Sequence, residues 1–137
     1  MTINLDSTGD INDLIHYRIE CCDNTLKESD CLAQFKMWPG ALNRLYYACY
    51  YIVVALLLKK GIAVKTHAGV RTMFSLHFVK EGIVSSDSGK FYHSLFDLRH
   101  LSDYDDQIVC DEETYRLSRK DADMFLEETK RVLDHLK

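Results

Sequence analysis

The stretch NRLYYACYYIVVALLLKKG, residues 43–61, decides the fold of this chain. Its apolar part, residues 45–58, is fourteen residues long, contains four tyrosines and lies between Arg44 and two lysines. A helix that spans a bilayer needs roughly 20 consecutive apolar residues, whereas a shorter helix that is apolar on every side is typical of the centre of a bundle. The stretch therefore predicts a buried central helix over residues 40–60 and no membrane span.

Further helices are indicated on both sides of this one by apolar residues at three- and four-residue spacing. They are expected over residues 11–30, 66–80 and 91–104, and from Asp111 to the C-terminus. Thr66 and Asp111 are residue types that cap helix N-termini. The apolar stripe of the last helix is expected to consist of Leu117, Ala122, Phe125, Leu126, Val132, Leu133 and Leu136.

The segments between these helices carry few breakers, since the 137 residues include one proline and six glycines. Residues 1–9 show no periodicity and are expected to form a loose terminus. Pro39 lies in the break before the central helix, while residues 85–89 and 105–110 are expected to be loops. The prediction is an all-α fold: a single domain over residues 1–137, built as an antiparallel five-helix bundle with an up-and-down core.

Charge and cysteine content limit the classes of function. The net charge of −4 argues against broad, sequence-blind binding to a polyanion, although it allows a small basic site. The five cysteines show neither CxxC nor Cys/His metal spacing, so no metal or other cofactor is expected. An odd number of cysteines without an N-terminal signal pattern favours reduced thiols in the cytoplasm.

The strongest candidate for chemistry is the segment 96–105, FDLRHLSDYD. Arg99 and Asp103 are four residues apart, so on a helix they share a face at roughly 5–6 Å between Cβ atoms, and Tyr104 follows directly. One interpretation is an internal ion pair that ties this helix into the bundle. Because buried pairs add little net stability, the alternative is that these groups are held for function.

Three other sets of residues are weaker candidates. Asn43, Arg44 and Tyr47 lie close together on the central helix, either as a polar tie within an aromatic core or as support for a site on another helix. His67 follows the Thr66 cap, where its ring can reach a neighbouring helix. Arg71 and His77 are about 120° apart on a straight helix, so we interpret their spacing as coincidental.

Together these segments resemble the HEPN domain family. The resemblance rests on Asn43-Arg44-x-Tyr46-Tyr47-Ala48, Thr66-His67, Phe74, Phe78-Val79-Lys80 and Arg99-x3-Asp103-Tyr104, and it covers about residues 40–135. It implies an antiparallel helical bundle that forms a two-fold homodimer. It further implies a toxin-like, metal-independent ribonuclease that is neutralised by a small nucleotidyltransferase, with an Arg-x4–6-His motif at the dimer cleft.

In this chain the motif departs from that pattern. The arginine corresponds to Arg99, but positions 104–106 are Tyr, Asp and Asp, which is the Arg-x3-Asp-Tyr form of one branch of the family. In the first hypothesis the protein acts on RNA: Arg99 grips phosphate, Asp103 orients the substrate, and His100 or Tyr104 supplies a proton. In the second it is a non-catalytic module that binds a nucleotide or docks the nucleotidyltransferase, with Tyr104 as a residue that the partner modifies. Asn43, Arg44, Tyr47 and His67 support the site in both.

Overall fold

The computed structural model describes residues 8–104 and 110–136, with the backbone alone for residues 8 and 102–104. Five α-helices and one π-helical turn account for its secondary structure, and the described residues form no strand. The helices are α1 (Thr8–Gln34), α2 (Trp38–Lys59), α3 (His67–Phe74), α4 (Ser86–Tyr104) and α5 (Glu112–His135), and the π-turn η1 (Ser75–Val79) continues α3. The predicted all-α helical bundle is confirmed.

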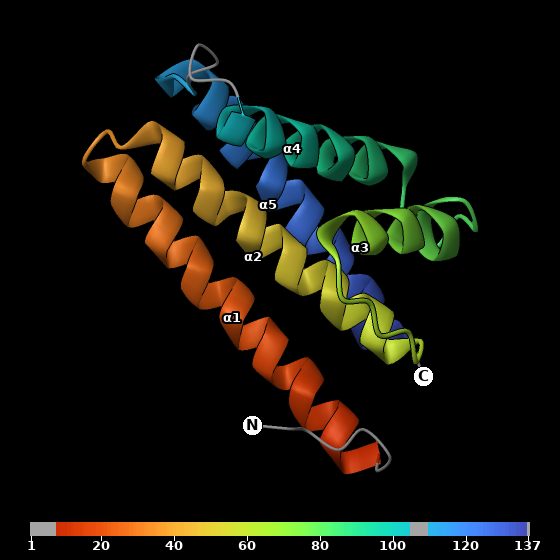
Figure 1. Ribbon diagram of the computed structural model, residues 1–137. Coiled ribbons are helices and arrows are strands. Elements are labelled where there is room, and N and C mark those ends of the chain that lie inside the picture. The colour runs from red at the N-terminus through yellow and green to blue at the C-terminus, as the bar shows by residue number, and fades with distance from the viewer. Residues whose placement is uncertain (1–7, 105–109, 137) are drawn as a thin grey trace.

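The two longest elements of the N-terminal half, α1 and α2, form an antiparallel hairpin (Figure 1). The chain reverses at Lys36, whose φ of 58° is unusual for a non-glycine residue. Pro39 lies in the first turn of α2, as predicted. Helix α1 begins earlier and ends later than expected, so residues 8 and 9 are helical, whereas residues 1–7 of the predicted loose terminus lie outside the described residues.

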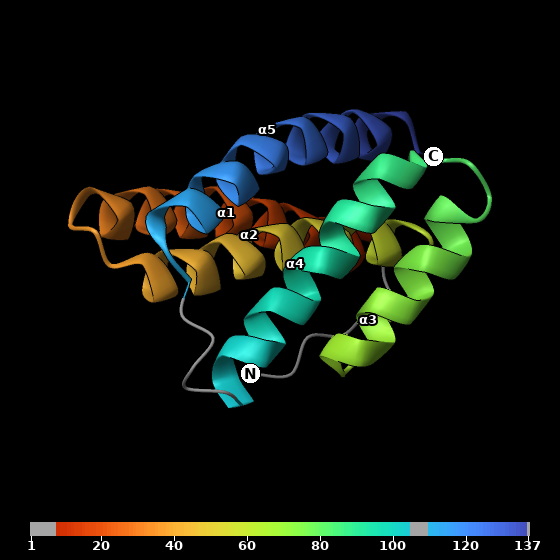
Figure 2. The ribbon, with the colours of Figure 1, turned by 90° about the horizontal axis from the view of Figure 1, so that it is seen from above.

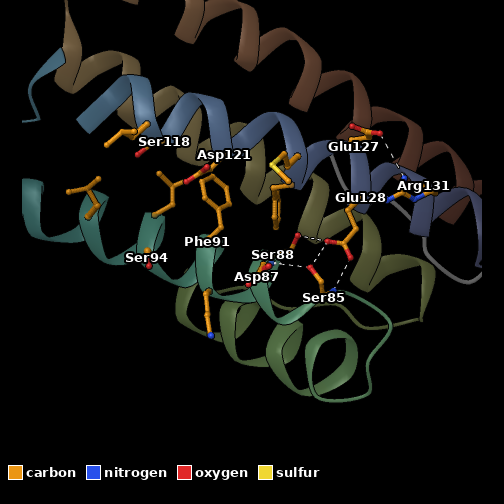
Figure 3. Close-up of a pocket in the computed structure, with 16 residues that line it drawn as sticks. Ser85, Asp87, Ser88, Phe91, Ser94, Ser118, Asp121, Glu127, Glu128 and Arg131 are labelled. Atoms are coloured by element: carbon orange, nitrogen blue, oxygen red, sulfur yellow. Dashed lines mark hydrogen bonds and ion pairs between the residues drawn. The ribbon is translucent and has the colours of Figure 1, made fainter. Parts of the chain in front are cut away.

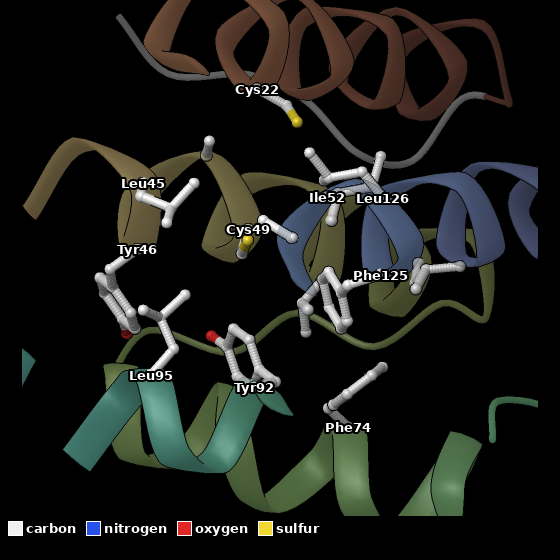
Figure 4. Packing of buried hydrophobic residues seen from close by; sticks show 14 of the residues in the cluster. Cys22, Leu45, Tyr46, Cys49, Ile52, Phe74, Tyr92, Leu95, Phe125 and Leu126 are labelled. Atoms are coloured by element: carbon white, nitrogen blue, oxygen red, sulfur yellow. The ribbon is translucent and has the colours of Figure 1, made fainter. Parts of the chain in front are cut away.

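The core is built around α2, which has α1 on one side, α3 and α4 on the other, and α5 behind it in Figure 1. Leu45, Cys49 and Ile52 are fully buried here (Figure 4). Among the described helices, α2 alone is long and apolar enough to cross a membrane, but 67% of its most apolar window is buried inside the protein. This degree of burial is that of the core helix of a soluble domain.

Three aromatic rings join the other helices to this core. Phe74 of α3, Tyr92 of α4 and Phe125 of α5 have ring centroids 5.5 Å (Phe74–Tyr92), 5.9 Å (Tyr92–Phe125) and 6.1 Å (Phe74–Phe125) apart. Each of these side chains is at most 1% exposed, and full burial of such a side chain contributes about 1.5–3 kcal/mol. The rings therefore anchor α3 and α4, which cross α2 obliquely (Figure 2).

The start of α3 agrees with the sequence, but its end does not. Thr66 caps α3 by accepting a hydrogen bond from the Gly69 backbone N–H at 3.0 Å. The predicted continuous helix 66–80 changes into the π-turn η1 at Ser75. The chain then turns at Gly82, whose φ of 75° suits glycine.

Helix α4 begins at Ser86, within the segment 85–89 that was expected to be a loop. The cause lies on α5, where the Glu128 carboxylate accepts hydrogen bonds from the Ser85 backbone N–H (2.8 Å), the Ser85 hydroxyl (2.7 Å) and the Ser88 hydroxyl (Figure 3). Burial opposes the charge on Glu128, but these hydrogen bonds outweigh it and lower the pKa. A carboxylate at a helix N-terminus is favourable, so the loop prediction failed because the capping group is distant in sequence.

Helix α5 begins as predicted and packs against α2 and α4. The Asp111 side chain accepts a hydrogen bond from the Thr114 backbone N–H at 2.8 Å, which confirms the expected cap. Arg119 links α5 to Asp30 of α1 by two hydrogen bonds, at 2.8 and 3.2 Å. Leu117 was expected in the apolar stripe, but its side chain is 59% exposed because it lines the open groove between α4 and α5.

Candidate functional site

Arg99, on the C-terminal half of α4, reaches across to α2. Its Nε donates to Asn43 Oδ1 at 3.4 Å, and its Nη2 donates to the Tyr47 hydroxyl at 3.3 Å. The guanidinium carbon also lies 5.5 Å from the Tyr46 ring centroid and 5.3 Å from that of Tyr47, within the range of a cation–π interaction. The structure thus brings Arg99 together with two of the support residues predicted from the sequence.

His67, the first residue of α3, enters the same group of rings. Its Nδ1 is 2.8 Å from the Tyr46 hydroxyl, and its ring stacks on Tyr50 with a centroid separation of 4.4 Å. Burial, and secondly the positive charge of Arg99, lower the pKa of His67 from its ordinary value of 6.5. The imidazole is therefore neutral at pH 7, and it lies close enough to Arg99 to feel its charge.

The two residues that complete this group are Tyr46 and Arg44. Tyr46 is fully buried, and burial raises the pKa of its phenol to about 12, so it stays protonated. Arg44 lies on the outer side of α2 with its guanidinium carbon 4.9 Å from the Tyr47 ring centroid. An arginine, a neutral imidazole and a second cation thus surround one pair of tyrosines.

The remaining predicted site residues lie at the end of α4. His100 is exposed, and its ring stacks on Phe96 at a centroid distance of 6.0 Å. The backbone of Asp103 and Tyr104 belongs to the last turn of α4, but their side chains lie outside the described residues. The Arg99–Asp103 pair therefore stays a prediction.

Arg71 of α3 contacts two residues of α4, which its spacing from His77 did not indicate. Its guanidinium carbon is 4.2 Å from the Phe96 ring centroid, and its Nη1 is 3.3 Å from Asp97 Oδ1. Phe96 is in turn in edge contact with Tyr46, at 6.1 Å between centroids. Arg71 thus belongs to the edge of the site, and no signal on its own helix could show this, because its partners are on α4.

A groove of about 810 Å³ lies elsewhere, between α4 and α5, and contains neither Arg99 nor His67 (Figure 3). Its polar centre is the Glu128 carboxylate, which accepts hydrogen bonds from the hydroxyls of Ser85 and Ser88 in capping α4. Chemistry is better supported at Arg99, where cations gather. Within the described residues no group of three His, Cys, Asp or Glu side chains is placed to hold a metal ion.

Comparison with known proteins agrees with this arrangement. The family model described as "HEPN domain" matches residues 15–137, which is most of the chain. The chain belongs to the HEPN domain family. The HEPN match includes every element that builds the site, from α2 with its tyrosines to α3 with His67 and α4 with Arg99.

Individual relatives cover nearly the whole domain. A "UPF0332 protein" of Thermotoga maritima is 36% identical over 118 residues, which is 86% of this chain and 86% of the relative. Two proteins of Methanocaldococcus jannaschii, each named "Putative toxin", are 33% identical over 127 residues (93% of this chain and 94% of the relative) and 31% identical over 115 residues (84% and 78%). This HEPN domain is thus related over most of its length to proteins that carry a toxin name.

Proposed function

We propose that this HEPN domain is a toxin-type protein that cleaves RNA without a metal ion, with Arg99 and His67 as its catalytic residues. The observation that carries the proposal is that Arg99 and His67, from different helices, converge on Tyr46 and Tyr47 while His67 is kept neutral. A cation for the phosphate and a neutral imidazole as base are two of the groups that ribose-assisted phosphodiester cleavage uses. The names of the two archaeal relatives support a toxin role.

In this mechanism His67 is the general base. The mechanism uses the His67 tautomer in which Nδ1–H donates to the Tyr46 oxygen, 2.8 Å away. In that tautomer Nε2 is left to accept the proton of a ribose 2′-hydroxyl. The 2′-oxygen then forms a bond to the adjacent phosphorus, and the bond from phosphorus to the 5′-oxygen breaks. His100 or Tyr104 supplies the proton that the departing 5′-oxygen takes up, and the products are a cyclic phosphate and a 5′-hydroxyl.

Arg99 stabilises the charge that develops on the phosphate oxygens. Guanidinium N–H groups bind phosphate oxygens with strong, directional hydrogen bonds. Asn43 and Tyr47 hold the guanidinium in place by accepting from Nε and Nη2. Asp103, one turn further along α4, would orient Arg99 or the ribose.

The test is cleavage of a labelled single-stranded RNA by purified variants. Arg99→Ala is expected to lower kcat by about 10²–10³-fold, as for removal of one oxyanion donor, and His67→Gln by about 10²–10⁴-fold, as for loss of a general base. Arg116→Ala is the matched control, because Arg116 is an exposed arginine of α5 paired with Glu112. Equal cleavage by Arg99→Ala and the native protein would show that the assignment is wrong.

A second function is favoured by the way Arg99 is held. Two of its nitrogens already donate to α2. Positions 104–106, where an Arg-x4–6-His motif would have its histidine, are Tyr, Asp and Asp. This arrangement suits a non-catalytic module that binds a nucleotide or docks a nucleotidyltransferase. Calorimetric titration with nucleotides separates the two functions, since this one requires binding without cleavage.

The proposal includes partners and a compartment. We propose a homodimer that pairs with a nucleotidyltransferase and acts in the cytoplasm. The described cysteines are all free, and burial raises the pKa of Cys22 to about 12 and that of Cys49 well above its usual range. Such thiols are unreactive, as suits a reducing compartment. Light scattering of the protein alone and with the nucleotidyltransferase tests both associations.

A further inference from the structure

The half-exposed side chains of α2 form one continuous stripe on the side of the helix away from the core. The stripe consists of Asn43, Arg44, Tyr47, Tyr50, Tyr51 and Val54. At 1.5 Å per residue, it extends roughly 15 Å along α2. In Figure 1 it belongs to the helix that lies between α1 and the α3–α4 pair, with α5 behind. The stripe begins beside Arg99, which bonds to Asn43 and Tyr47.

Arg18 of α1 lies at the other end of the stripe. Its guanidinium carbon is 5.7 Å from the ring centroids of both Tyr17 and Tyr51. Its Nε is buried without a hydrogen-bond partner, and Arg18 forms no ion pair with any described residue. A guanidinium N–H in this state is costly to bury, so the position is poorly explained by stability.

Arg44, at the Asn43 end of the stripe, also forms no ion pair with a described residue, although it lies over the Tyr47 ring. The arginines on the other faces differ, because each has a carboxylate within 4 Å. These pairs are Arg71–Asp97, Arg116–Glu112, Arg119–Asp30 and Arg131–Glu127. In a protein of net charge −4, two arginines without carboxylates beside one row of tyrosines suggest an anionic ligand with flat rings.

We propose that this stripe, from Arg99 to Arg18, is a binding track for single-stranded RNA. The phosphate to be cleaved lies at Arg99, Arg44 holds a phosphate at the same end of the stripe, and Arg18 holds one further along the strand. Tyr17, Tyr47 and Tyr51 stack on the bases. The position of the reacting phosphate rests on the proposed function, whereas the track itself does not. Unpaired bases are required, because bases within a duplex already stack on one another and cannot reach the rings.

Binding of a strand that cannot be cleaved tests the track. The probe is a fluorescent twelve-nucleotide 2′-O-methyl oligouridylate, followed by anisotropy at several salt concentrations. Arg18→Gln, Arg44→Gln and Tyr51→Leu are each expected to raise Kd by about 5- to 100-fold, the range for loss of a stacking or phosphate contact. Arg116→Gln, on the outer face of α5, is the control and should bind as the native protein does.

The salt dependence distinguishes the two kinds of contact. Loss of a phosphate contact in Arg18→Gln should reduce the slope of log K against log salt by about 0.7. Tyr51→Leu should weaken binding with an unchanged slope, because stacking releases no counterion. A duplex of the same length should bind more weakly. Arg44→Gln provides an independent result if Arg18→Gln proves unstable, since Arg44 lies at the surface of a different helix.

Two outcomes would overturn the track. One is binding by the stripe variants that equals binding by Arg116→Gln. The other is a change in molar mass by light scattering in Arg18→Gln or Tyr51→Leu, which would make the stripe a contact between copies of the chain. If the track fails in either way while Arg18→Gln still cleaves RNA with an unaltered KM, the proposed function stands without the track. If the stripe binds the strand but the protein does not cleave unmodified RNA, the track stands and the proposed function is wrong.

Discussion

The two sides of α2 both carry large apolar or aromatic side chains but lie in opposite environments. On one side Leu45, Cys49 and Ile52 are fully buried against the other helices (Figure 4). On the other side Tyr47 and Tyr51 stay half-exposed and have arginines over their rings. Within residues 45–58 both sides belong to the same apolar run, so apolarity alone does not separate a core from a binding surface. The difference lies in what the neighbouring helices place beside each side.

The largest effect should come from the core side. Phe125→Ala is expected to lower the free energy of unfolding by about 3–5 kcal/mol, because a fully buried ring leaves a cavity. The comparison variant is Tyr51→Leu on the stripe, where we expect a loss of under about 1 kcal/mol. Urea denaturation measures both, and equal losses would mean that the stripe is structural.

A smaller effect should come from a polar group inside the core. The Ser29 hydroxyl is fully buried, donates to the Ala41 carbonyl oxygen at 2.7 Å and is 2.8 Å from the Tyr115 hydroxyl. Ser29→Ala is expected to cost about 1–3 kcal/mol, because it removes a partner from the buried Tyr115 hydroxyl. The exposed Ser94→Ala is the control and should stay within about 0.5 kcal/mol of the native protein. If thermal or urea unfolding shows the same loss of stability for Ser29→Ala and Ser94→Ala, the Ser29 hydroxyl does not stabilise the core.

The smallest effect concerns the charge of His67 at the edge of the stripe. Its pKa is lowered in the folded protein, so unfolding takes up protons between that pKa and the ordinary value of 6.5. The contribution of His67 to the free energy of unfolding should therefore be fully present above pH 6.5 and be lost as the pH is lowered through the folded pKa. The loss should be small, because solvent screens the half-exposed ring. Cleavage should be lost over the same range, since protonated imidazole is no base.

NMR titration of the His67 ring checks the cause of this shift. In Arg99→Gln the pKa of His67 should rise towards its ordinary value, because a neighbouring positive charge has been removed. Arg116→Gln, which changes a distant charge by the same amount, should leave it in place. If the pKa of His67 does not change in Arg99→Gln, the charge of Arg99 does not act on His67, and the two residues do not form one site.

Several parts of the fold were predictable because their causes are local. The helices and the caps at Thr66 and Asp111 depend on residues within a few positions of each other. Asn43 and Tyr47 could be assigned to one site because they are one turn apart on α2.

Other parts depend on partners that are distant in the sequence. The start of α4 is set by Glu128, more than forty residues later. Arg71 looked isolated on its own helix, yet Phe96 and Asp97 meet it from α4. Arg18 offered no motif at all, and its role depends on α1 lying beside Tyr51.

The sequence by itself determined that this chain is a helical bundle built on α2 and that Arg99 is its leading candidate for chemistry. Periodicity, capping residues and a short motif act over one or two turns, which is the range that a sequence pattern can report. Only the tertiary structure decided that His67 stands with Arg99 and that the row of tyrosines on α2 is half-exposed between Arg99 and Arg18. Those facts follow from how the helices pack, because packing sets which charges meet and which side chains water can reach.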